Sequence, residues 1–172
     1  MSVCKIIVMG VSGCGKSLIG TLLAERLGVP FFDADDFHSP ANVAKMASGV
    51  PLTDADRSGW LDDLAELVRG EQGGLVLACS ALKRTYRDRL RAGNPSLQFV
   101  YLRGDMETIW SRHASREDHY FNGRAMLESQ FLTLQEPEPD EEAMTVDVSE
   151  PPERIIERCL SALGAPERGR RN

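Results

Sequence analysis

The segment from Gly10 to Ser17, GVSGCGKS, is the feature that most constrains how this chain folds. It matches the pattern G-x-x-x-x-G-K-[ST] at every fixed position and is named the phosphate loop below. The five residues before it, KIIVM, are typical of a buried parallel strand, and apolar residues recur at helical spacing over residues 18–27 after it. A strand, a glycine-rich turn and a helix in this order direct backbone N–H groups toward an anion. The segment therefore predicts binding of a nucleoside triphosphate.

The fixed residues of the phosphate loop have distinct expected roles. Lys16 is expected to reach the β- and γ-phosphates of the nucleotide, and the Ser17 hydroxyl is expected to hold Mg²⁺. Glycine at three positions lets the backbone curl round a phosphate chain without Cβ clashes. The residues of this segment expected to bind ATP are Gly10, Ser12, Gly13, Cys14, Gly15, Lys16 and Ser17.

Composition argues against several other classes of protein. The chain has 172 residues, enough for one domain with a sizeable core, and its net charge of -6 argues against nucleic acid or a membrane surface as a partner. No apolar run approaches the ~20 residues of a membrane span. The first strand begins almost at the N-terminus, which leaves no room for a signal peptide, so the cytoplasm is the expected location. The four cysteines are scattered, which suggests neither a zinc site nor a disulfide framework.

Apolar runs and helical periodicities alternate along the chain. Strands are expected at residues 5–9, 29–33, 75–79, 99–102 and 143–148. Helices are expected at about 17–27, 40–47, 53–68, 81–92, 106–114, 124–134 and 152–163, the third with Thr53 or Asp54 as its N-cap. This order predicts an α/β fold, a five-stranded parallel sheet covered on both faces, in a single domain over residues 1–164. Residues 165–172 are expected to form a disordered tail.

Two aspartates follow the second expected strand, where the carboxyl end of a parallel strand faces a ligand. Asp33 and Asp35 are two residues apart, so in an extended segment their side chains point the same way, toward the phosphate loop. One carboxylate could ligate Mg²⁺ and the other could accept a proton from a substrate hydroxyl. The alternative is a solvated acidic turn in which Asp35 or Asp36 caps a helix. His38 follows, either as a partner of a substrate hydroxyl or as a cap of the turn.

A polar and basic segment follows the third expected strand. No acidic residue ends this strand, where many phosphate-loop GTPases and ATPases place a metal-linked aspartate, so Asp33 is left as the metal-side acid. Ser80 is placed to contact a hydroxyl group. Lys83 and Arg87 are four residues apart and therefore share one helix face. This basic face suits a substrate with a carboxylate, or it is a solvated helix of salt bridges.

Two arginines at i, i+4 spacing, Arg112 and Arg116, lie beside a polar segment that ends at Gly123. Arginines that descend onto the phosphates neutralise charge in the transition state, and a segment that closes over them excludes water. We therefore expect a lid, with Arg116 as its catalytic cation and Arg112 as a second phosphate contact. The alternative is a surface loop with ordinary charges.

Taken together, these residues resemble the gluconokinases, the small phosphate-loop kinases of gluconate. The resemblance runs from about residue 3 to residue 163. Beside the phosphate loop, the segments that carry it are DAD with His38 at 33–38, NVAKMASGVPLTDADR at 42–57, CSALK at 79–83, SQF at 129–131 and LQEP at 134–137. The segments at 45–49 and 80–83 are far more specific than the phosphate loop, which many families share.

The resemblance implies a three-layer α/β/α fold like that of nucleoside monophosphate kinases, with a substrate-side helical segment at 37–60 and a lid at 112–130. It implies transfer of the γ-phosphoryl group of ATP to the 6-hydroxyl of D-gluconate, often by a homodimer. Asp33 and Asp35 resemble the acids at the metal and the substrate hydroxyl, with Asp35 favoured as the base. The residues that resemble the gluconate pocket are Asp35, His38, Lys45, Arg57, Ser80, Lys83 and Arg87.

Two other functions fit part of these observations. Shikimate also combines a carboxylate with hydroxyl groups, so a kinase for another small hydroxy acid shares most of the expected chemistry. A nucleotide-binding regulatory module is the alternative from another class, although the missing acid after the third strand argues against a GTPase-like switch. A screen of acceptors separates the two kinases, and acceptor-stimulated turnover separates either kinase from the module.

Overall fold

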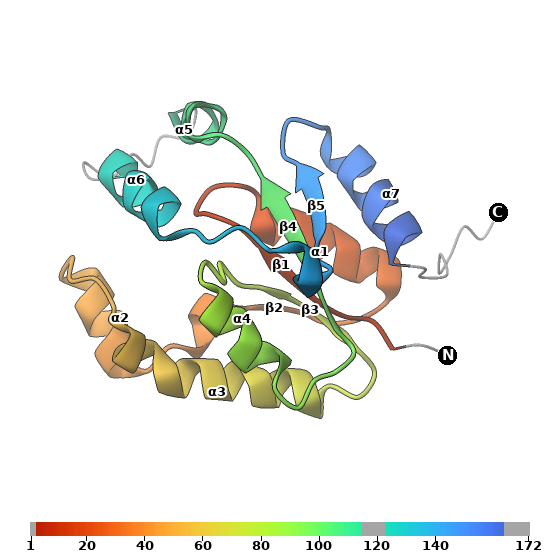
Figure 1. Cartoon of the computed structure of the whole chain (residues 1–172), viewed down its shortest axis with the longest axis horizontal. Coiled ribbons are helices and arrows are strands. Elements are labelled where there is room, and N and C mark those ends of the chain that lie inside the picture. Colours follow the sequence, from red (N-terminus) through yellow and green to blue (C-terminus); the bar gives the residue numbers. More distant parts are fainter. Residues whose placement is uncertain (1–2, 115–122, 164–172) are drawn as a thin grey trace.

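Five parallel strands form the centre of the computed structural model, which describes residues 3–114 and 123–163 (Figure 1). The strands are β1 (Lys5–Met9), β2 (Phe31–Asp33), β3 (Leu75–Ala78), β4 (Leu97–Arg103) and β5 (Met144–Asp147). Their order in the sheet is β2-β3-β1-β4-β5, and every neighbouring pair is parallel. All five carboxyl ends therefore lie at one edge of the sheet. The predicted five-stranded parallel sheet is confirmed.

Helices cover both faces of this sheet (Figure 1). The α-helices within the described residues are α1 (Lys16–Leu27), α2 (Pro40–Ala47), α3 (Asp54–Gly70), α4 (Arg84–Arg91), α5 (Met106–Ala114), α6 (Gly123–Thr133) and α7 (Pro152–Ala162). One face of the sheet packs against α1 and α7, and the opposite face packs against α3 and α4. The predicted three-layer α/β/α arrangement is confirmed.

The alternation of side chains along β1 supplies both layers of the core. Ile6 belongs to an apolar cluster with Leu23 of α1 and Ile156 of α7. Ile7, the next residue, belongs to a second cluster with Leu64 of α3. All of these side chains are buried, and each contributes about 1.5–3 kcal/mol by its removal from water. Because successive strand residues point to opposite faces, a continuous apolar run in the sequence produces a sheet buried on both sides.

Two helix starts on the substrate side are fixed by side-chain caps. Ser39 accepts the backbone N–H of Asn42 at 3.1 Å, and Pro40 occupies the first turn of α2. Thr53 and Asp56 form a reciprocal capping box at the start of α3. Of the two N-caps that the sequence allows for α3, the structure therefore selects Thr53.

The helix expected at 81–92 is shorter in the structure, where α4 begins only at Arg84. Ala81 has a φ of 46° and Lys83 an extended backbone, so neither residue continues a right-handed helix. Lys83 thus becomes the N-cap residue of α4 and precedes the helix that carries Arg87.

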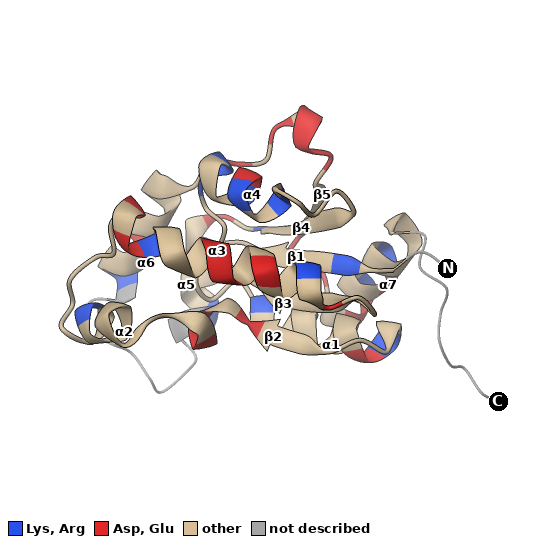
Figure 2. Cartoon of the chain, turned by 90° about the horizontal axis from the view of Figure 1, so that it is seen from below, with Lys and Arg blue, Asp and Glu red and all other residues tan. Residues whose placement is uncertain are grey.

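Charged residues of both signs are spread over the helices, and an acidic turn lies beside the basic helix α4 (Figure 2). This turn includes the short 3₁₀ helix η2 (Pro139–Glu141), which precedes β5. Within residues 3–114 and 123–163, no helix combines the length and the apolar character needed to cross a membrane.

Candidate active site

The phosphate loop connects β1 to α1 at the carboxyl edge of the sheet (Figure 1). Gly10 has a φ of 148°, and a Cβ atom there would lie 2.7 Å from the sulfur of Cys14, so only glycine fits. Cys14 is itself buried, and burial raises the pKa of its thiol, which packs as an apolar group. Gly15 is the N-cap of α1, and no described side chain caps that helix. The first N–H groups of α1 are therefore left for an anion, which supports the predicted phosphate site.

Lys16 and Ser17 begin α1 and contact the loop and its neighbour. The Lys16 ammonium group donates to the Val11 carbonyl oxygen at 3.0 Å, so this side chain folds back along the loop. The Ser17 hydroxyl donates to Asp33 Oδ2 at 3.4 Å, which joins the start of α1 to the end of β2. This contact brings a hydroxyl and a carboxylate oxygen together, and hard oxygen donors are those that Mg²⁺ prefers.

The chain turns directly after Asp33, where β2 ends. Residues 34–37 form a 3₁₀ helix, η1 (Ala34–Phe37), and not the extended segment that the sequence predicts. Asp33 is the N-cap of η1, and its Oδ1 atom accepts the backbone N–H of Asp35 at 3.0 Å. The extended backbone expected between the two aspartates is therefore absent, because β2 ends at Asp33, although Asp35 still lies close enough to feel the charges of Asp33 and Lys16. Asp33 is held by Ser17 and by the turn, whereas the Asp35 side chain is 84% exposed.

Asp35 and His38 lie together at the two ends of η1. Although most of the surface of the Asp35 side chain is accessible, partial desolvation of its carboxyl group by neighbouring atoms and, after it, the negative charge of Asp33 raise the pKa of Asp35. The His38 side chain is only 4% exposed and stacks on Trp60, with ring centroids 4.2 Å apart. Burial lowers the pKa of His38, so the ring is neutral near pH 7. His38 Nε2 lies 4.0 Å from Asp35 Oδ1.

The contacts of Asn42, on α2, decide which ring nitrogen of His38 carries the proton. The buried Asn42 side chain donates through Nδ2 to the Asp56 carbonyl oxygen at 2.9 Å, which fixes the orientation of its amide. The same nitrogen lies 3.4 Å from His38 Nδ1. His38 Nδ1 is therefore the acceptor and Nε2 carries the proton. The neutral histidine thus turns an N–H donor toward Asp35.

Aspartates at the start of α3 pair with two lysines predicted to bind substrate. Lys45 Nζ donates to Asp56 Oδ2 at 2.7 Å, and this bond is the main reason why the pKa of Asp56 falls to about 2. Lys83 Nζ donates to Asp54 Oδ1 at 3.1 Å. The Tyr86 hydroxyl also donates to Asp54 and is the main cause of the lowered pKa of that carboxyl. Sequence reasoning missed the pairing of these two aspartates with the lysines, because it took them only for the start of a helix.

Arg57, on α3, differs from both lysines in its partners. Its Nη1 atom donates to the Leu52 carbonyl oxygen at 2.9 Å and to the Tyr86 hydroxyl at 3.2 Å. The guanidinium carbon also lies 5.6 Å from the centroid of the Tyr86 ring. These partners are neutral, and within the described part of the chain no carboxylate forms a salt bridge with Arg57. Its charge is therefore better placed than that of either lysine to bind an incoming anion.

Ser80 lies at the end of β3, beside the phosphate loop. Its backbone carbonyl accepts the N–H of Gly10 at 3.3 Å, so the main chain at Ser80 ties β3 to the first residue of the loop. The side chain is half-buried at the carboxyl edge of the sheet. The structure therefore brings Ser80 to the edge where the sequence predicts a hydroxyl contact.

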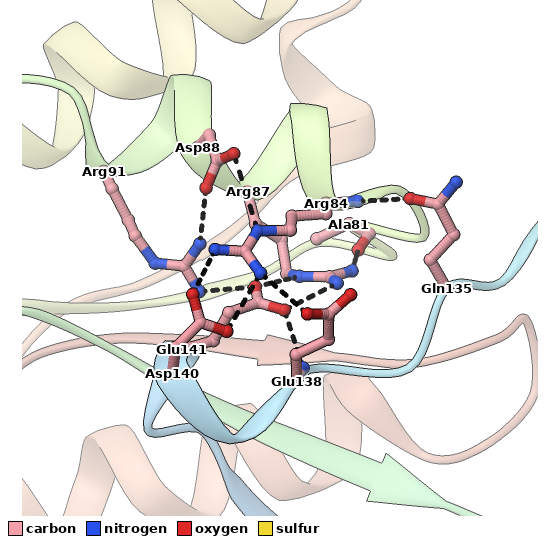
Figure 3. Close-up of polar contacts among 9 residues, drawn as sticks. All are labelled: Ala81, Arg84, Arg87, Asp88, Arg91, Gln135, Glu138, Asp140 and Glu141. Atoms are coloured by element: carbon pink, nitrogen blue, oxygen red, sulfur yellow. Dashed lines mark hydrogen bonds and ion pairs between the residues drawn. The ribbon is translucent and has the colours of Figure 1, made fainter.

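Arg87 lies outside this region, in a buried ion pair (Figure 3). Its Nε and Nη2 atoms donate to the two carboxylate oxygens of Glu141 at 2.7 and 3.1 Å, and Nη1 donates to the Ala81 carbonyl oxygen at 2.8 Å. The Arg87 side chain is 0% exposed and that of Glu141 is 1% exposed. The prediction that Arg87 binds substrate is therefore wrong, because each of its nitrogens is already bonded and no solvent reaches it.

Two other arginines of α4, Arg84 and Arg91, bind the same acidic turn (Figure 3). Arg91 Nη2 donates to Glu141 Oε1 at 2.7 Å, and Arg84 Nη1 donates to Asp140 Oδ1 at 2.9 Å and to Glu138 Oε2 at 3.2 Å. Most of the basic residues of α4 thus hold the segment before β5 against the helix. Arg87 therefore forms a salt bridge, as in the alternative that the sequence left open, but the pair is buried and not solvated.

Arg112, on α5, lines a cavity of about 250 Å³ beside the phosphate loop. The same cavity is lined by Gly15, by Leu18 of α1 and by Pro151, which follows β5. Sequence reasoning missed this last segment, although two consecutive prolines directly after the final strand were an available signal. Arg116 and the rest of residues 115–122 lie outside the described residues, so the lid contact predicted for Arg116 stays a prediction.

Comparisons with known proteins identify the family. The sequence model of the shikimate kinase family matches residues 12–163. The thermoresistant gluconokinase of Escherichia coli (strain K12) is 43% identical over 161 residues, which cover 91% of this chain and 91% of the relative. The match to the family model therefore includes residues 12–17 of the phosphate loop and the whole segment predicted to lie on the substrate side.

Two solved structures extend the similarity to three dimensions. A gluconokinase from Sinorhizobium meliloti 1021 has a TM-score of 0.86 and 40% identity, covering 94% of this chain and 91% of that chain. A sugar kinase from Janibacter sp. HTCC2649 has a TM-score of 0.87 and 46% identity, covering 95% and 96%. The predicted phosphate-loop kinase fold is confirmed, and the chain belongs to the gluconokinase family of ATP-dependent kinases.

Proposed function

We propose that this chain transfers the γ-phosphoryl group of ATP to the 6-hydroxyl of D-gluconate, giving 6-phosphogluconate and ADP. One observation carries the proposal: the structure links the phosphate loop to the substrate-side segment without a break. Side-chain and turn contacts run along the path Ser17, Asp33, Asp35, His38, Asn42, Asp56 and Lys45. In a chain of the gluconokinase family, this path connects the nucleotide end of the site to the acceptor end.

The nucleotide is proposed to lie along the phosphate loop, with its base in the cavity beside Gly15. Arg112 and Pro151, which are far apart in the sequence, both line that cavity, and Leu18 adds an apolar surface. A cation and apolar groups together suit the flat face of a purine. Lys16 then leaves the Val11 carbonyl and binds the β- and γ-phosphates.

A divalent metal, which we take to be Mg²⁺, is proposed to bind at Ser17 and Asp33. The fit rests on the contact between their oxygens, since a hydroxyl and one carboxylate leave the remaining positions to phosphate oxygens and water. No cluster of three or more histidine, cysteine or acidic side chains suited to a metal occurs among the described residues, so a cage made of protein alone is not expected. When bound, the metal neutralises charge on the phosphates.

Asp35 is proposed as the general base that accepts the proton of the 6-hydroxyl. Its carboxylate is exposed, whereas Asp33 is occupied by Ser17 and by the turn. The raised pKa of Asp35 makes its carboxylate a stronger base than an ordinary aspartate. The Nε2–H group of His38 lies on the same side and can hold the carboxylate or a neighbouring substrate hydroxyl.

The carboxylate of gluconate is proposed to bind Arg57, because this cation has only neutral partners within the described residues. Lys45 and Lys83 are paired with aspartates that also accept hydrogen bonds from hydroxyl groups. A polyol with one terminal carboxylate matches this mixture of a cation without a salt bridge among the described residues and several paired charges. His38 and Ser80 complete the proposed pocket.

Three further features are proposed from the sequence. Arg116 neutralises charge on the transferred phosphoryl group within a lid at 112–130. The enzyme is a homodimer, which light scattering on the purified chain would test. It works in the cytoplasm, a location that suits four unpaired cysteines.

The test of the function is ADP release with Mg·ATP and a panel of acceptors that includes D-gluconate, shikimate, glycerate, hexoses and no acceptor. We expect a strong signal with gluconate alone. A signal with shikimate would retain the kinase and overturn the assignment of the pocket. Nucleotide binding without any acceptor-dependent signal would favour the regulatory module.

A further inference from the structure

One residue of α6 touches the phosphate loop directly. The Gln130 side-chain oxygen accepts the backbone N–H of Ser12 at 2.6 Å, across 118 residues of sequence. The backbone carbonyl of Gln130 accepts the N–H of Leu134 at 2.8 Å, and the next residue, Phe131, packs against the apolar cluster under α1. Gln130 is thus fixed through its main chain, through its neighbour and through its own side chain.

The direction of the Gln130 amide follows from its partner. A backbone N–H can only donate, so the atom that faces Ser12 must be the carbonyl oxygen of the amide. The NH₂ group of Gln130 therefore points away from Ser12 while staying next to the loop. Among the residues that the structure describes, none accepts a hydrogen bond from this NH₂ group, and the side chain is only half-buried. Two neutral donors are thus available beside the phosphate loop.

The position of Ser12 connects these donors to the reaction. The N–H of Ser12 and the carbonyl of Val11 belong to one peptide unit, and Lys16 donates to that carbonyl at 3.0 Å. Gln130 and Lys16 therefore hold the two sides of the same peptide. Lys16 is the residue of this motif that reaches the γ-phosphate, so Gln130 borders the same end of the phosphate site.

We propose that Gln130 is a further catalytic residue, whose carbonyl fixes the Val11–Ser12 peptide and whose NH₂ group donates to an oxygen of the γ-phosphoryl group during transfer. The proposal rests on the proposed kinase function and adds a residue to it. A fixed, neutral donor at this place stabilises the charge that develops on the transferred group and needs no reorganisation. No bond to Gln130 forms or breaks in the step.

The rival explanation is that Gln130 only ties α6 to the loop. The substitution Gln130→Glu separates the two, because glutamate keeps an oxygen acceptor for Ser12 and replaces the NH₂ donors by a negatively charged oxygen. Gln130→Met removes both functions at similar size. The matched control is Gln135→Glu, since the Gln135 side chain likewise accepts a backbone N–H, that of Arg84 at 3.0 Å, but at the start of α4.

The experiment measures nucleotide affinity and turnover in the full chain, with melting temperature as the check on folding. For Gln130→Glu we expect ADP affinity within about threefold of wild type, ATP affinity lowered at least about tenfold and kcat lowered about 10²-fold, the scale of losing one oxyanion donor. For Gln130→Met we expect a similar loss of kcat, and for Gln135→Glu no change in either quantity. The selective loss of ATP over ADP is a readout that a structural tie alone would not produce.

Two results would overturn the role of Gln130. One is a Gln130→Glu enzyme with kcat and ATP affinity within about threefold of wild type. The other is an equal loss of ADP and ATP affinity, which would reduce the residue to a structural tie. Failure of the proposed function would be seen separately, as a wild-type enzyme that releases no ADP in response to gluconate. In that case the ratio of ATP to ADP affinity in the Gln130→Glu variant still decides the role of Gln130.

Discussion

Arg87 and Glu141 form a buried, two-pronged ion pair across 54 residues of sequence, with 2.7 Å between Nε and Oε1. The pair joins α4 to the turn before β5 (Figure 3). Since β5 is an edge strand of the sheet, the pair also helps to position that edge. A buried pair of this kind costs desolvation, which is offset only while both partners are present. It therefore ties the fold together without taking part in the chemistry.

The substitution Arg87→Met should lower the free energy of unfolding by about 3–5 kcal/mol, because it leaves the Glu141 carboxylate buried without its main partner. Urea unfolding measures the change. The double variant Arg87→Met, Glu141→Leu should regain most of this loss, since both buried charges are gone. Activity per folded molecule should stay near wild type in the double variant, and a raised KM for gluconate would return Arg87 to the substrate pocket.

The same pair predicts how stability depends on pH. Burial alone would raise the pKa of Glu141, but hydrogen bonds from Arg87, Arg91 and the backbone of Glu138 hold the pKa at about 2. The unfolded value is near 4.3. Since the folded pKa is the lower one, the stabilisation is complete above about pH 5 and is lost as the pH falls toward 2. Urea unfolding between pH 7 and pH 3 should show a shallower decline for Glu141→Gln than for wild type, and equal slopes would contradict the assignment.

Asp35→Asn should lower kcat by a factor on the order of 10³, the scale of losing a general base. KM for ATP should change less, because no hydrogen bond among the described residues joins the Asp35 side chain to the phosphate loop. Steady-state kinetics with gluconate separate the two quantities, and Asp33→Asn is the comparison, with its main effect expected on the divalent-metal dependence. Near-normal turnover of Asp35→Asn would show that the base lies elsewhere.

In the pH profile of kcat/KM, the midpoint of the acid limb should lie above the ordinary pKa of an aspartate. The reason is that desolvation and the charge of Asp33 raise the pKa of Asp35. The base must be deprotonated to act, so activity falls as the pH drops through its pKa. The substitution Asp35→Asn should remove this limb, because an amide does not titrate. The pH profile of the residual activity checks this, and a limb that stays in place would exclude Asp35 as the titrating group.

Arg57→Ala should raise KM for gluconate by roughly 10²-fold, the equivalent of a charge-assisted hydrogen bond of about 1.5–3 kcal/mol. KM for ATP should stay within about threefold, since the hydrogen bonds of Arg57 within residues 3–114 and 123–163 go to Leu52 and Tyr86 and not to the phosphate loop. Arg89→Ala, at an arginine of α4 that bonds to Ser58, is the matched control and should alter neither constant. If Arg57→Ala leaves KM for gluconate unchanged, another cation binds the carboxylate.

Much of the fold is visible in the sequence because its signals are local. The apolar run before Gly10 and the helical spacing after Ser17 predict β1 and α1 correctly. Local reasoning fails where the backbone departs from the assumed element. It orients Asp33 and Asp35 as in a strand, although the strand ends at Asp33 and a 3₁₀ turn follows.

The phosphate loop in its strand–helix setting, the parallel sheet and the acids at the carboxyl end of β2 can all be predicted from the amino-acid sequence. Which charged groups pair with one another depends on how the chain folds. Lys83 and Arg87 lie four residues apart on a similar basic stretch, yet one pairs with exposed Asp54 and the other is buried on Glu141. The N–H of Ser12 likewise finds Gln130 only when the chain returns along α6. A charged group or a hydrogen-bond donor in the sequence does not reveal its distant partner, because the path of the folded chain determines which groups come together.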